Sequence, residues 1–599
     1  MSERPEAGRP SGASVIWAGI WFALLAGFVE TAVLLIRHFN DRFIHRSREF
    51  LWMTPTGYLL LFALPLVVIW LLYQSGRISF QLSVFFLGAG AATSVLLVLL
   101  GGKLHPAAIL LLGIGTGLQI GRLAQRSAPS FSRHVSRAAP LFLLLVVLVG
   151  VGTWGLRSWQ ARTALSQLPA ARAGAPNIVL IILDTVRAAS LSLYGYAGET
   201  SPELERWARR GVVFDKAIAT APWTLPSHAS LFTGHMPPDH SADWLTPLDD
   251  RWLTLGEALQ REGYRTGGFV ANLIYATWEH GLDRGFNHYE DYPFSLGMLL
   301  RNTVLGRKLT DARRLRQVLK NDEVIGRKSA SRIGRDFLSW VDRDSARPFF
   351  AFLNYYDAHD PYLPPQDYFR KFAGHYRENR LSPLRRGGPF IRKDRLTASE
   401  IEHERASYDG AIAYLDSELS ALFTQLEQRN ILAQTLVIVT SDHGEEFGEH
   451  GVFFHGHTLY RQALHVPLMM VGPGVVEGRR VTQTVSLRDI PATIASLLNL
   501  PVTFPGSSLS RYWSDTLATE SPVFSYTSQG IRIPDWFPAA HGNLASVIRD
   551  SLHYIQGRDS QMFHWGRDPL EQNNLAVHDE ARPIVEQLRA ILGQEQPGE

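Results

Sequence analysis

Residues 176–185 read PNIVLIILDT, an unbroken apolar run that ends in a carboxylate, Asp184. A run of this kind is typical of a strand buried on both faces, as the strands of parallel sheets are. Open α/β sheets bind their ligands at the carboxyl ends of such strands. We therefore predict an α/β domain with a mainly parallel central sheet and a functional site beside Asp184.

A second apolar run has the same form. Residues 435–443 read TLVIVTSDH, so Asp442 and His443 follow another predicted strand. Thr224 heads a third segment, TLPSHASLFTG (residues 224–234), which has the form of a helix start. Two carboxylates, an imidazole and a hydroxyl together suit one divalent cation. The ordinary interpretation of each is helix capping, because Asp, Ser and Thr commonly cap helix N-termini.

Further segments complete the pattern. They read NYYDAHDPY (354–362), GEHG (448–451), HGHTLY (455–460), HVPL (465–468) and DPLEQNNL (568–575). In this order, with the three segments above, they resemble the sulfatase family of the alkaline-phosphatase superfamily over residues 176 to about 576. The resemblance implies the α/β fold of that family, a metal site, and a nucleophile at Thr224.

Departures from the family pattern bear on the chemistry. Many sulfatases convert a Cys or Ser nucleophile into formylglycine, but oxidation of Thr224 would give a ketone, and the chain has no Cys. We therefore expect no formylglycine and a direct attack by the Thr224 hydroxyl, which a metal ion or a base must activate. Thr185 stands where the family usually has a second Asp, and His443 where it often has Asn. These changes favour zinc or manganese over calcium.

The site hypothesis is one divalent ion held by Asp184, Asp442, His443 and the oxygen of Thr224. His228 replaces the Arg of the family signature and is a candidate for substrate binding. In these features the site resembles membrane-bound phosphoethanolamine transferases, lipoteichoic-acid synthases and soluble phosphodiesterases more than formylglycine sulfatases.

Three histidines complete the candidate site. His359 and His455 are candidates for steadying nonbridging oxygens or for protonating the leaving alkoxide. His457 competes with His455, because the spacing to Tyr460 can be aligned either way with the family pattern. Each of the three has an ordinary interpretation as a hydrogen-bonded structural histidine. Their spacing allows a second metal ion but does not require one.

Three functions stay open at this point. The favoured one is a hydrolase or transferase that acts on a phosphodiester of a lipid or envelope polymer by phosphoryl transfer through Thr224. The first alternative is a sulfuric ester hydrolase that uses Thr224 directly. The other alternative is a non-catalytic membrane protein or pseudoenzyme, although a decayed site would be expected to lose ligands.

The net charge of +3 gives no reason to expect a nucleic-acid partner. Expected partners are the lipid bilayer and a lipid-linked, envelope or carbohydrate ester, and the oligomeric state is open.

The first 156 residues are of a different kind. Apolar stretches at about 15–36, 57–74, 79–101, 106–121 and 139–156 are long enough to cross a hydrocarbon core of roughly 30 Å. We predict a membrane module of about five transmembrane helices in residues 1–156, a linker in 157–175, and a catalytic domain in 176–599. The fourth stretch is short and rich in Gly, so a re-entrant segment is the alternative there.

The orientation rests on resemblance. An odd number of spans places the N-terminus and the catalytic domain on opposite sides of the membrane, and basic residues flank the spans about equally on both sides. By likeness to the membrane transferases, we expect a multi-pass protein of a bacterial cytoplasmic membrane with an extracytoplasmic catalytic domain. Glu30, within the first span, is expected to contact a lipid substrate or a neighbouring helix, or to lie at the membrane edge.

Overall fold

The computed structural model describes residues 10–40, 43–319, 324–344, 346–373, 382–384, 390–514 and 520–595. Within them the chain divides into two compact units. The first holds the residues up to Thr163 together with Tyr292–Leu319 and Val324–Gly326. The second holds Ala164–Asp291 and the residues from Arg327 onward. The first unit therefore includes a segment that comes from far along the chain.

Five helices of the described chain are long and apolar enough to cross a membrane, which confirms the predicted number. Their composition fits a membrane-anchored protein. The fifth helix has 39 residues and extends beyond the apolar stretch at both ends. The five are α1 (Gly12–His38), α2 (Phe50–Gln74), α3 (Phe80–Leu100), α4 (Pro106–Arg126) and α5 (Ala128–Ser166).

The glycines of α4 have a packing role. This helix is continuous over 21 residues, so the re-entrant alternative is not what the structure shows. A Cβ added at Gly113 would lie 2.0 Å from Thr93 Oγ1, and one added at Gly117 would lie 2.6 Å from the Cβ of Ala89. Glycine lets α4 approach α3 more closely than any other residue could, as small residues do between membrane helices.

Glu30 of α1 is completely buried in the first unit. Its carboxylate accepts hydrogen bonds from the hydroxyl of Tyr58 in α2 at 2.7 Å and from the backbone N–H of Val304 at 2.9 Å. Arg46 lies 3.4 Å away and donates through Nε to the carbonyl oxygen of Asn302. Asn302 follows α9 (Leu296–Arg301), and Val304 begins α10 (Val304–Thr310). Glu30 and Arg46 therefore attach the connection between these two short helices to α1 and α2. The contact is with neighbouring protein, one of the expected alternatives.

Replacing Glu30 by Ala should destabilise the first unit. The change removes the acceptor of two buried hydrogen bonds and takes the carboxylate away from Arg46, and breaking a buried ion pair costs about 3–5 kcal/mol. The expected result is a clear fall in the melting temperature of the detergent-solubilised protein. Glu30→Gln is the control, because it keeps an acceptor oxygen and should lose less. An unchanged melting temperature for Glu30→Ala would contradict the assignment.

The second unit is built on a mainly parallel sheet, as predicted. The order of its described strands is β11-β2-β10-β6-β1-β5-β3-β4, and β9 pairs with β2. β10 and β9 run antiparallel to their neighbours. The strands are β1 (Asn177–Leu183), β2 (Gly211–Ile218), β3 (Arg265–Val270), β4 (His288–Glu290), β5 (Phe349–Tyr355), β6 (Thr435–Thr440), β9 (His465–Val466), β10 (Leu468–Val471) and β11 (Arg479–Ser486).

The register of the central strands sets the position of the site. Ile182 of β1 pairs with Thr440 of β6, and Leu183 pairs with Tyr355 of β5. The three strands are parallel, so their carboxyl ends meet at one edge of the sheet. Asp184 and Asp442 follow β1 and β6 directly, and the sheet therefore brings these two carboxylates close together.

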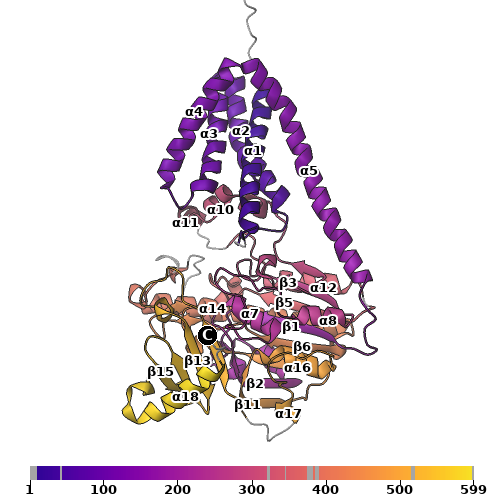
Figure 1. Ribbon diagram of the computed structural model, residues 1–599, viewed down its shortest axis with the longest axis vertical. Helices are drawn as coiled ribbons and strands as arrows, with labels where there is room; N and C mark the ends of the chain where they lie inside the picture. Colours follow the sequence, from indigo (N-terminus) through magenta and orange to yellow (C-terminus); the bar gives the residue numbers. More distant parts are fainter. Residues whose placement is uncertain are drawn as a thin grey trace, which may run out of the picture. The chain divides into compact units, whose positions relative to one another are not determined.

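Helices cover both faces of this sheet (Figure 1). Alternate side chains of β1, including Val179 and Ile181, pack into a core with the helices of one face. Phe232 of α7 packs at 5.0 Å against Phe352 of β5 on the other face. The first face carries α6 (Pro202–Ala208), α12 (Ala330–Val341) and α14 (Ala398–Gln428), and the second carries α7 (Thr224–Thr233), α8 (Leu255–Arg261) and α16 (Asp489–Leu498).

A smaller antiparallel sheet follows near the C-terminal end of the chain (Figure 1). Its described strands are β12 (Val523–Thr527), β13 (Leu544–Arg549), β14 (Leu552–Gln556) and β15 (Gln561–His564). Helix α18 (Arg582–Glu595) packs on it through Val585, Leu588 and Leu592. Backbone N–H of Tyr526 in β12 donates to the carbonyl oxygen of Thr220, so this sheet is tied to the segment just before α7.

Candidate active site and metal centre

Asp184, Asp442 and His443 form a compact group at the carboxyl edge of the large sheet. All three are fully buried, and their potential ligand atoms lie within 4.8 Å of one another. His443 Nε2 is 3.3 Å from Asp442 Oδ2 and 3.9 Å from Asp184 Oδ1. The structure thus brings together the three residues that the sequence indicated as ligands of a divalent ion.

Each carboxylate of this group uses one oxygen within the protein. Asp184 Oδ2 accepts from the amides of Asn272 at 2.8 Å and Asn354 at 3.2 Å. Asp442 Oδ1 accepts from the backbone N–H groups of Thr185 and His443. The second oxygens, Asp184 Oδ1 and Asp442 Oδ2, are buried and accept no hydrogen bond of normal geometry from the described residues. Buried acceptors of this kind fit a bound cation.

The electrostatics of the group point the same way. Burial, together with the charge of Asp442, raises the pKa of Asp184 to about 8. Burial raises the pKa of Asp442 to about 7, and lowers that of His443 to about 4, which keeps the imidazole neutral as a ligand must be. Two buried carboxylates side by side need a positive charge to be stable as anions. The residues present therefore fit a divalent metal ion.

Thr185 directly follows Asp184, and its backbone N–H points toward the other carboxylate, Asp442. Its φ of 64° lies in the left-handed region, which is an outlier for a β-branched residue. The conformation holds because the Thr185 hydroxyl donates to the carbonyl oxygen of Ala358, and the hydroxyl of Tyr408 donates to the carbonyl oxygen of Thr185. It directs the Thr185 N–H toward Asp442 Oδ1 at 3.4 Å. Strain at such a position is typical of functional sites.

Thr224 is the first residue of α7, as the sequence predicted. Among the described contacts, its hydroxyl bonds to side chains of other elements and not to the backbone of the helix. Instead, Oγ1 accepts from Asn272 Nδ2 at 3.2 Å and lies 3.4 Å from His443 Nε2. The neighbouring Ser227 hydroxyl donates to the carbonyl oxygen of Asp442, which is a packing role. Thr224 is therefore the hydroxyl that the helix start presents to the metal-ligand group.

A cavity of about 230 Å³ opens beside Thr224. Its walls are strongly aromatic, and Trp223 and Trp244 stack on each other at 3.8 Å. Aromatic walls with a few polar groups are typical of sites that bind small ligands. The lining residues are Trp223, Thr224, Trp244, Tyr275, His359, Asp360, Phe390, Phe453, Phe454, His455, His457 and Phe537.

His455 is oriented by a buried carboxylate. Its Nδ1 lies 2.9 Å from Glu445 Oε1, and Tyr362 donates to the other oxygen of Glu445 at 2.7 Å. Burial raises the pKa of Glu445 to about 8 and lowers that of His455 to about 4. The His455 ring is 4.3 Å from that of His443. When Nδ1 donates to Glu445, Nε2 is the acceptor atom of this imidazole.

The other three histidines occupy different places. His359 lines the cavity, stacks on Tyr356 at 4.1 Å and has its pKa lowered well below the usual value by burial. His457 also lines the cavity and stacks on Trp244. His228 is fully buried, 3.5 Å from Asp442 Oδ2, and is not among the residues that line the described cavity.

Two asparagines complete the site and were not singled out from the sequence. Asn272 contacts both Thr224 and Asp184, and Asn354 contacts Asp184. Asn354 lies near the carboxyl end of β5, and Asn272 follows β3 by two residues. The rule that located Asp184, a polar residue at the end of an apolar strand, could have found both of them.

Comparison with known proteins places this site in a family. A family model described as Sulfatase matches residues 176–500. The chain belongs to the sulfatase family. This confirms the resemblance seen in the sequence and makes the protein an ester hydrolase by family.

Individual relatives of this sulfatase-family chain are distant. Arylsulfatase K of Homo sapiens is 28% identical over 447 residues, which cover 68% of this chain and 80% of that protein. Choline-sulfatase of Rhizobium meliloti is 25% identical over 448 residues, covering 67% and 83% of the two chains. Phosphonate monoester hydrolase of Agrobacterium radiobacter superposes with a TM-score of 0.55 at 22% identity, over 70% of this chain and 96% of the other, and shows the same fold.

Proposed function

We propose that this sulfatase-family protein is a metal-dependent hydrolase or transferase of phosphoesters that forms a covalent intermediate on Thr224. The observation that supports it is the contact of the Thr224 hydroxyl with His443 and, through Asn272, with Asp184. The favoured substrate is a phosphodiester of a lipid or an envelope polymer, because five apolar helices would hold the enzyme at a bilayer.

The metal-ligand group would hold one divalent ion. Asp184, Asp442 and His443 supply ligand atoms, and Thr224 lies beside them. When bound, the ion would lower the pKa of the Thr224 hydroxyl and neutralise charge on the attacked ester. An imidazole and only two carboxylates favour zinc or manganese over calcium, which prefers more oxygen ligands.

The side chains of the cavity carry the proposed chemistry. Oγ1 of Thr224 forms a bond to phosphorus in line with the leaving oxygen, whose bond to phosphorus breaks. The proton that leaves the Thr224 hydroxyl passes to water on the nucleophile's side, and His455 or His359 would donate a proton to the leaving alkoxide on the opposite side of phosphorus and regain it from water. Water or an acceptor alcohol then cleaves the phosphothreonine by the reverse sequence. His457, on the cavity wall, is the candidate for binding the nonbridging oxygens. His228, the other sequence candidate, lies outside the cavity lining and contacts Asp442, so its proposed role is to position the metal-ligand group.

Formylglycine has no place in this scheme. The nucleophile position holds Thr224, whose oxidation would give a ketone, and the sequence contains no Cys. We therefore propose that the enzyme acts with an unmodified hydroxyl. An intact Thr224 in a mass spectrum of the active protein would support this.

Sulfate ester hydrolysis by Thr224 is the second candidate, and the curated relatives favour it. Two of them, from Homo sapiens and Rhizobium meliloti, are named as sulfatases. Sulfate and phosphate esters share a tetrahedral oxyanion shape, so one cavity could accept either.

Paired assays separate the two candidates. With zinc or manganese present, the full-length protein should hydrolyse bis(4-nitrophenyl) phosphate with a kcat/KM roughly tenfold or more above that for 4-nitrophenyl sulfate. Accurate mass of the peptide that contains Thr224 should show phosphate on the hydroxyl. Faster sulfate hydrolysis with sulfated Thr224 would establish the second candidate. Inactivity on both esters with metal bound would favour a non-catalytic protein.

We also propose the cellular setting. The five apolar helices would span a bacterial cytoplasmic membrane as a multi-pass anchor, with the catalytic unit outside the cytoplasm. The orientation is taken from the resemblance to membrane transferases. The proposed partners are the bilayer and a lipid-linked, envelope or carbohydrate ester, without nucleic acid.

A further inference from the structure

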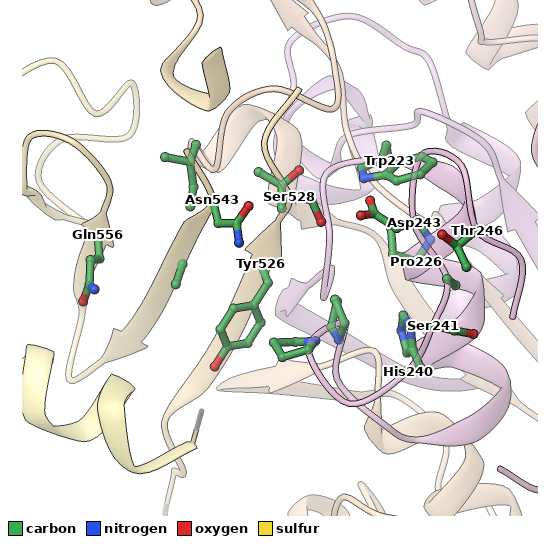
Figure 2. Close-up of a pocket in the computed structure, with 16 residues that line it drawn as sticks. Trp223, Pro226, His240, Ser241, Asp243, Thr246, Tyr526, Ser528, Asn543 and Gln556 are labelled. Carbon is green, nitrogen blue, oxygen red and sulfur yellow. The ribbon is translucent and has the colours of Figure 1, made fainter. Parts of the chain in front are cut away.

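Neither of the two cavities at Trp223 offers a cationic side chain to a lipid phosphate. Beside the active-site cavity, the second unit has a cavity of about 490 Å³ between the residues around Trp223 and the small sheet that carries Tyr526 (Figure 2). The described linings of both cavities contain no Lys or Arg. These are the side chains that usually contact phosphate in proteins. Cationic contacts with lipid phosphates must therefore lie elsewhere in the chain.

One strongly basic segment has no part in the proposed chemistry. It is Tyr292–Leu319, called here the α9–α11 segment, which belongs to the first unit although it comes from far along the chain. It contains α9, α10 and α11 (Arg313–Leu319). Its sequence has six basic residues and a single carboxylate, Asp311. A segment with this charge is attracted to anionic surfaces.

The backbone between α9 and α10 packs against membrane helices α1 and α2 well inside their ends (Figure 1). Val304 donates its N–H to Glu30, which lies about 12 Å before the end of α1 along the helix axis. A Cβ added at Gly57, about 10 Å after the start of α2, would lie 2.3 Å from the carbonyl oxygen of Leu299. The segment therefore lies beside the apolar part of these helices, at the depth where hydrocarbon gives way to headgroups.

Large apolar side chains of the α9–α11 segment are exposed. Leu296, Leu309 and Val318 are 68%, 49% and 79% exposed, and Phe294 and Leu315 are exposed as well. Soluble surfaces usually show such side chains singly, whereas a concentration of them marks a surface that contacts a membrane or another protein. The segment therefore needs an apolar neighbour outside the chain.

Cationic side chains stand next to these apolar ones. Lys308 precedes Leu309, Arg314 precedes Leu315, and all four side chains are exposed. Within the described residues neither of the two cations pairs with a carboxylate, and Asp311 is paired with two other arginines. Apolar and cationic side chains in this arrangement are typical of elements that lie in the membrane interface. A second copy of the chain fits less well, because a symmetric contact would bring two basic segments together.

We propose that the α9–α11 segment lies in the bilayer interface and binds anionic phospholipid headgroups. Its exposed apolar side chains enter the outer part of the hydrocarbon, and Lys308 and Arg314 contact lipid phosphates. The segment thus adds a contact with the headgroups to the anchoring by five apolar helices. This role holds for any ester that the second unit cleaves.

Site-specific fluorescence tests the depth of the segment, because the chain has no native Cys. Leu309→Cys, Leu315→Cys and Val318→Cys are each labelled with a bimane dye in the full-length protein and placed in phospholipid nanodiscs. A doxyl group at the fifth carbon of the lipid chain should quench all three dyes, and aqueous iodide should quench them weakly. Leu111→Cys, at an exposed position of α4, is the positive control. Val577→Cys is the matched negative control, since Val577 is 71% exposed but belongs to the second unit.

The preference for anionic lipid is tested with the same dye. Phosphatidylcholine nanodiscs receive a trace of doxyl lipid, either phosphatidylglycerol or phosphatidylcholine. With the dye at Val318→Cys, the phosphatidylglycerol probe should quench roughly fivefold more efficiently, as expected for a lipid attracted by nearby cations. Lys308→Gln/Arg314→Gln should bring the two probes close to equal. Arg558→Gln/Arg567→Gln removes two exposed cations of the second unit and should keep the difference.

Three results would overturn the proposal. Strong quenching by iodide without quenching by doxyl lipid would show a hydrated basic face. Protection of the dyes from both quenchers would show contact with a second copy or another protein. Equal quenching by the two doxyl lipids in the chain with all its cations would show that the headgroup charge is not recognised. Fluorescence requires no turnover, so each outcome is independent of the chemistry proposed for Thr224.

Discussion

Replacing Thr224 by Ala should reduce kcat by roughly 10³-fold or more while the protein still folds. The hydroxyl is the group that we propose to attack, and no other hydroxyl of α7 contacts the metal-ligand side chains in the described structure. Folding should survive, because the described contacts of the Thr224 hydroxyl are to His443 and Asn272 and not to the helix backbone, and Ala is a strong helix former. Steady-state rates with the better nitrophenyl ester measure the effect.

Two controls sharpen this result. Thr224→Ser keeps a hydroxyl in place and should retain measurable turnover. Thr233→Ala removes a buried hydroxyl at the other end of the same helix, where it donates to the carbonyl oxygen of Ala229, and should leave kcat near the wild-type value. Wild-type turnover by Thr224→Ala would disprove the nucleophile assignment, whatever the other variants do.

The strand ends explain why the metal-ligand group could be located from the sequence. Runs such as residues 178–183 are apolar enough to be buried on both faces, and burial of this kind occurs in parallel sheets. Parallel strands place their carboxyl ends at one edge, so Asp184 and Asp442 were expected to meet there. The reasoning needed only local patterns and one rule of topology.

The same reasoning could not supply the neighbours of this group. Asn272 reaches Asp184 because β5 lies next to β1 and β3 lies next to β5 in the sheet, and no single stretch of sequence specifies this strand order. Nor could it find the partner of Glu30, since Val304 is 274 residues away along the chain. Long-range pairing depends on the whole packing of the chain rather than on a local pattern.

The glycines of α4 could not show from the sequence whether this segment is a continuous helix, because that also depends on contacts with a distant part of the chain. Gly113 and Gly117 are compatible with an irregular segment or with a closely packed helix, and only the position of α3 decides between them. In the cavity, the histidine positions were visible in the sequence, but the aromatic walls around Thr224 were not. Their residues come from widely separated segments.

Replacing Asp442 by Asn should have opposite effects on the protein with and without metal. The variant should bind zinc or manganese at least about 100-fold more weakly, because one charged ligand is lost. Added metal should raise the melting temperature of the wild type, since a ligand at 100 times its Kd stabilises by about 2.7 kcal/mol, and should scarcely change that of the variant. Metal analysis of the purified proteins gives a reading that does not depend on turnover.

Without metal, Asp442→Asn should melt above the wild type. Asn can keep the acceptor for the N–H groups of Thr185 and His443, while its neutral NH₂ replaces Asp442 Oδ2 in the buried group that contains Asp184 Oδ1. The second buried negative charge disappears at the same time. Asp416→Asn is the control, because Asp416 is a buried carboxylate of α14 outside this group and its variant should keep the gain from metal. If the variant melts below the wild type both with and without metal, Asp442 supports only the fold. A metal ligand gives a different result: the variant melts above the wild type without metal and below it with metal.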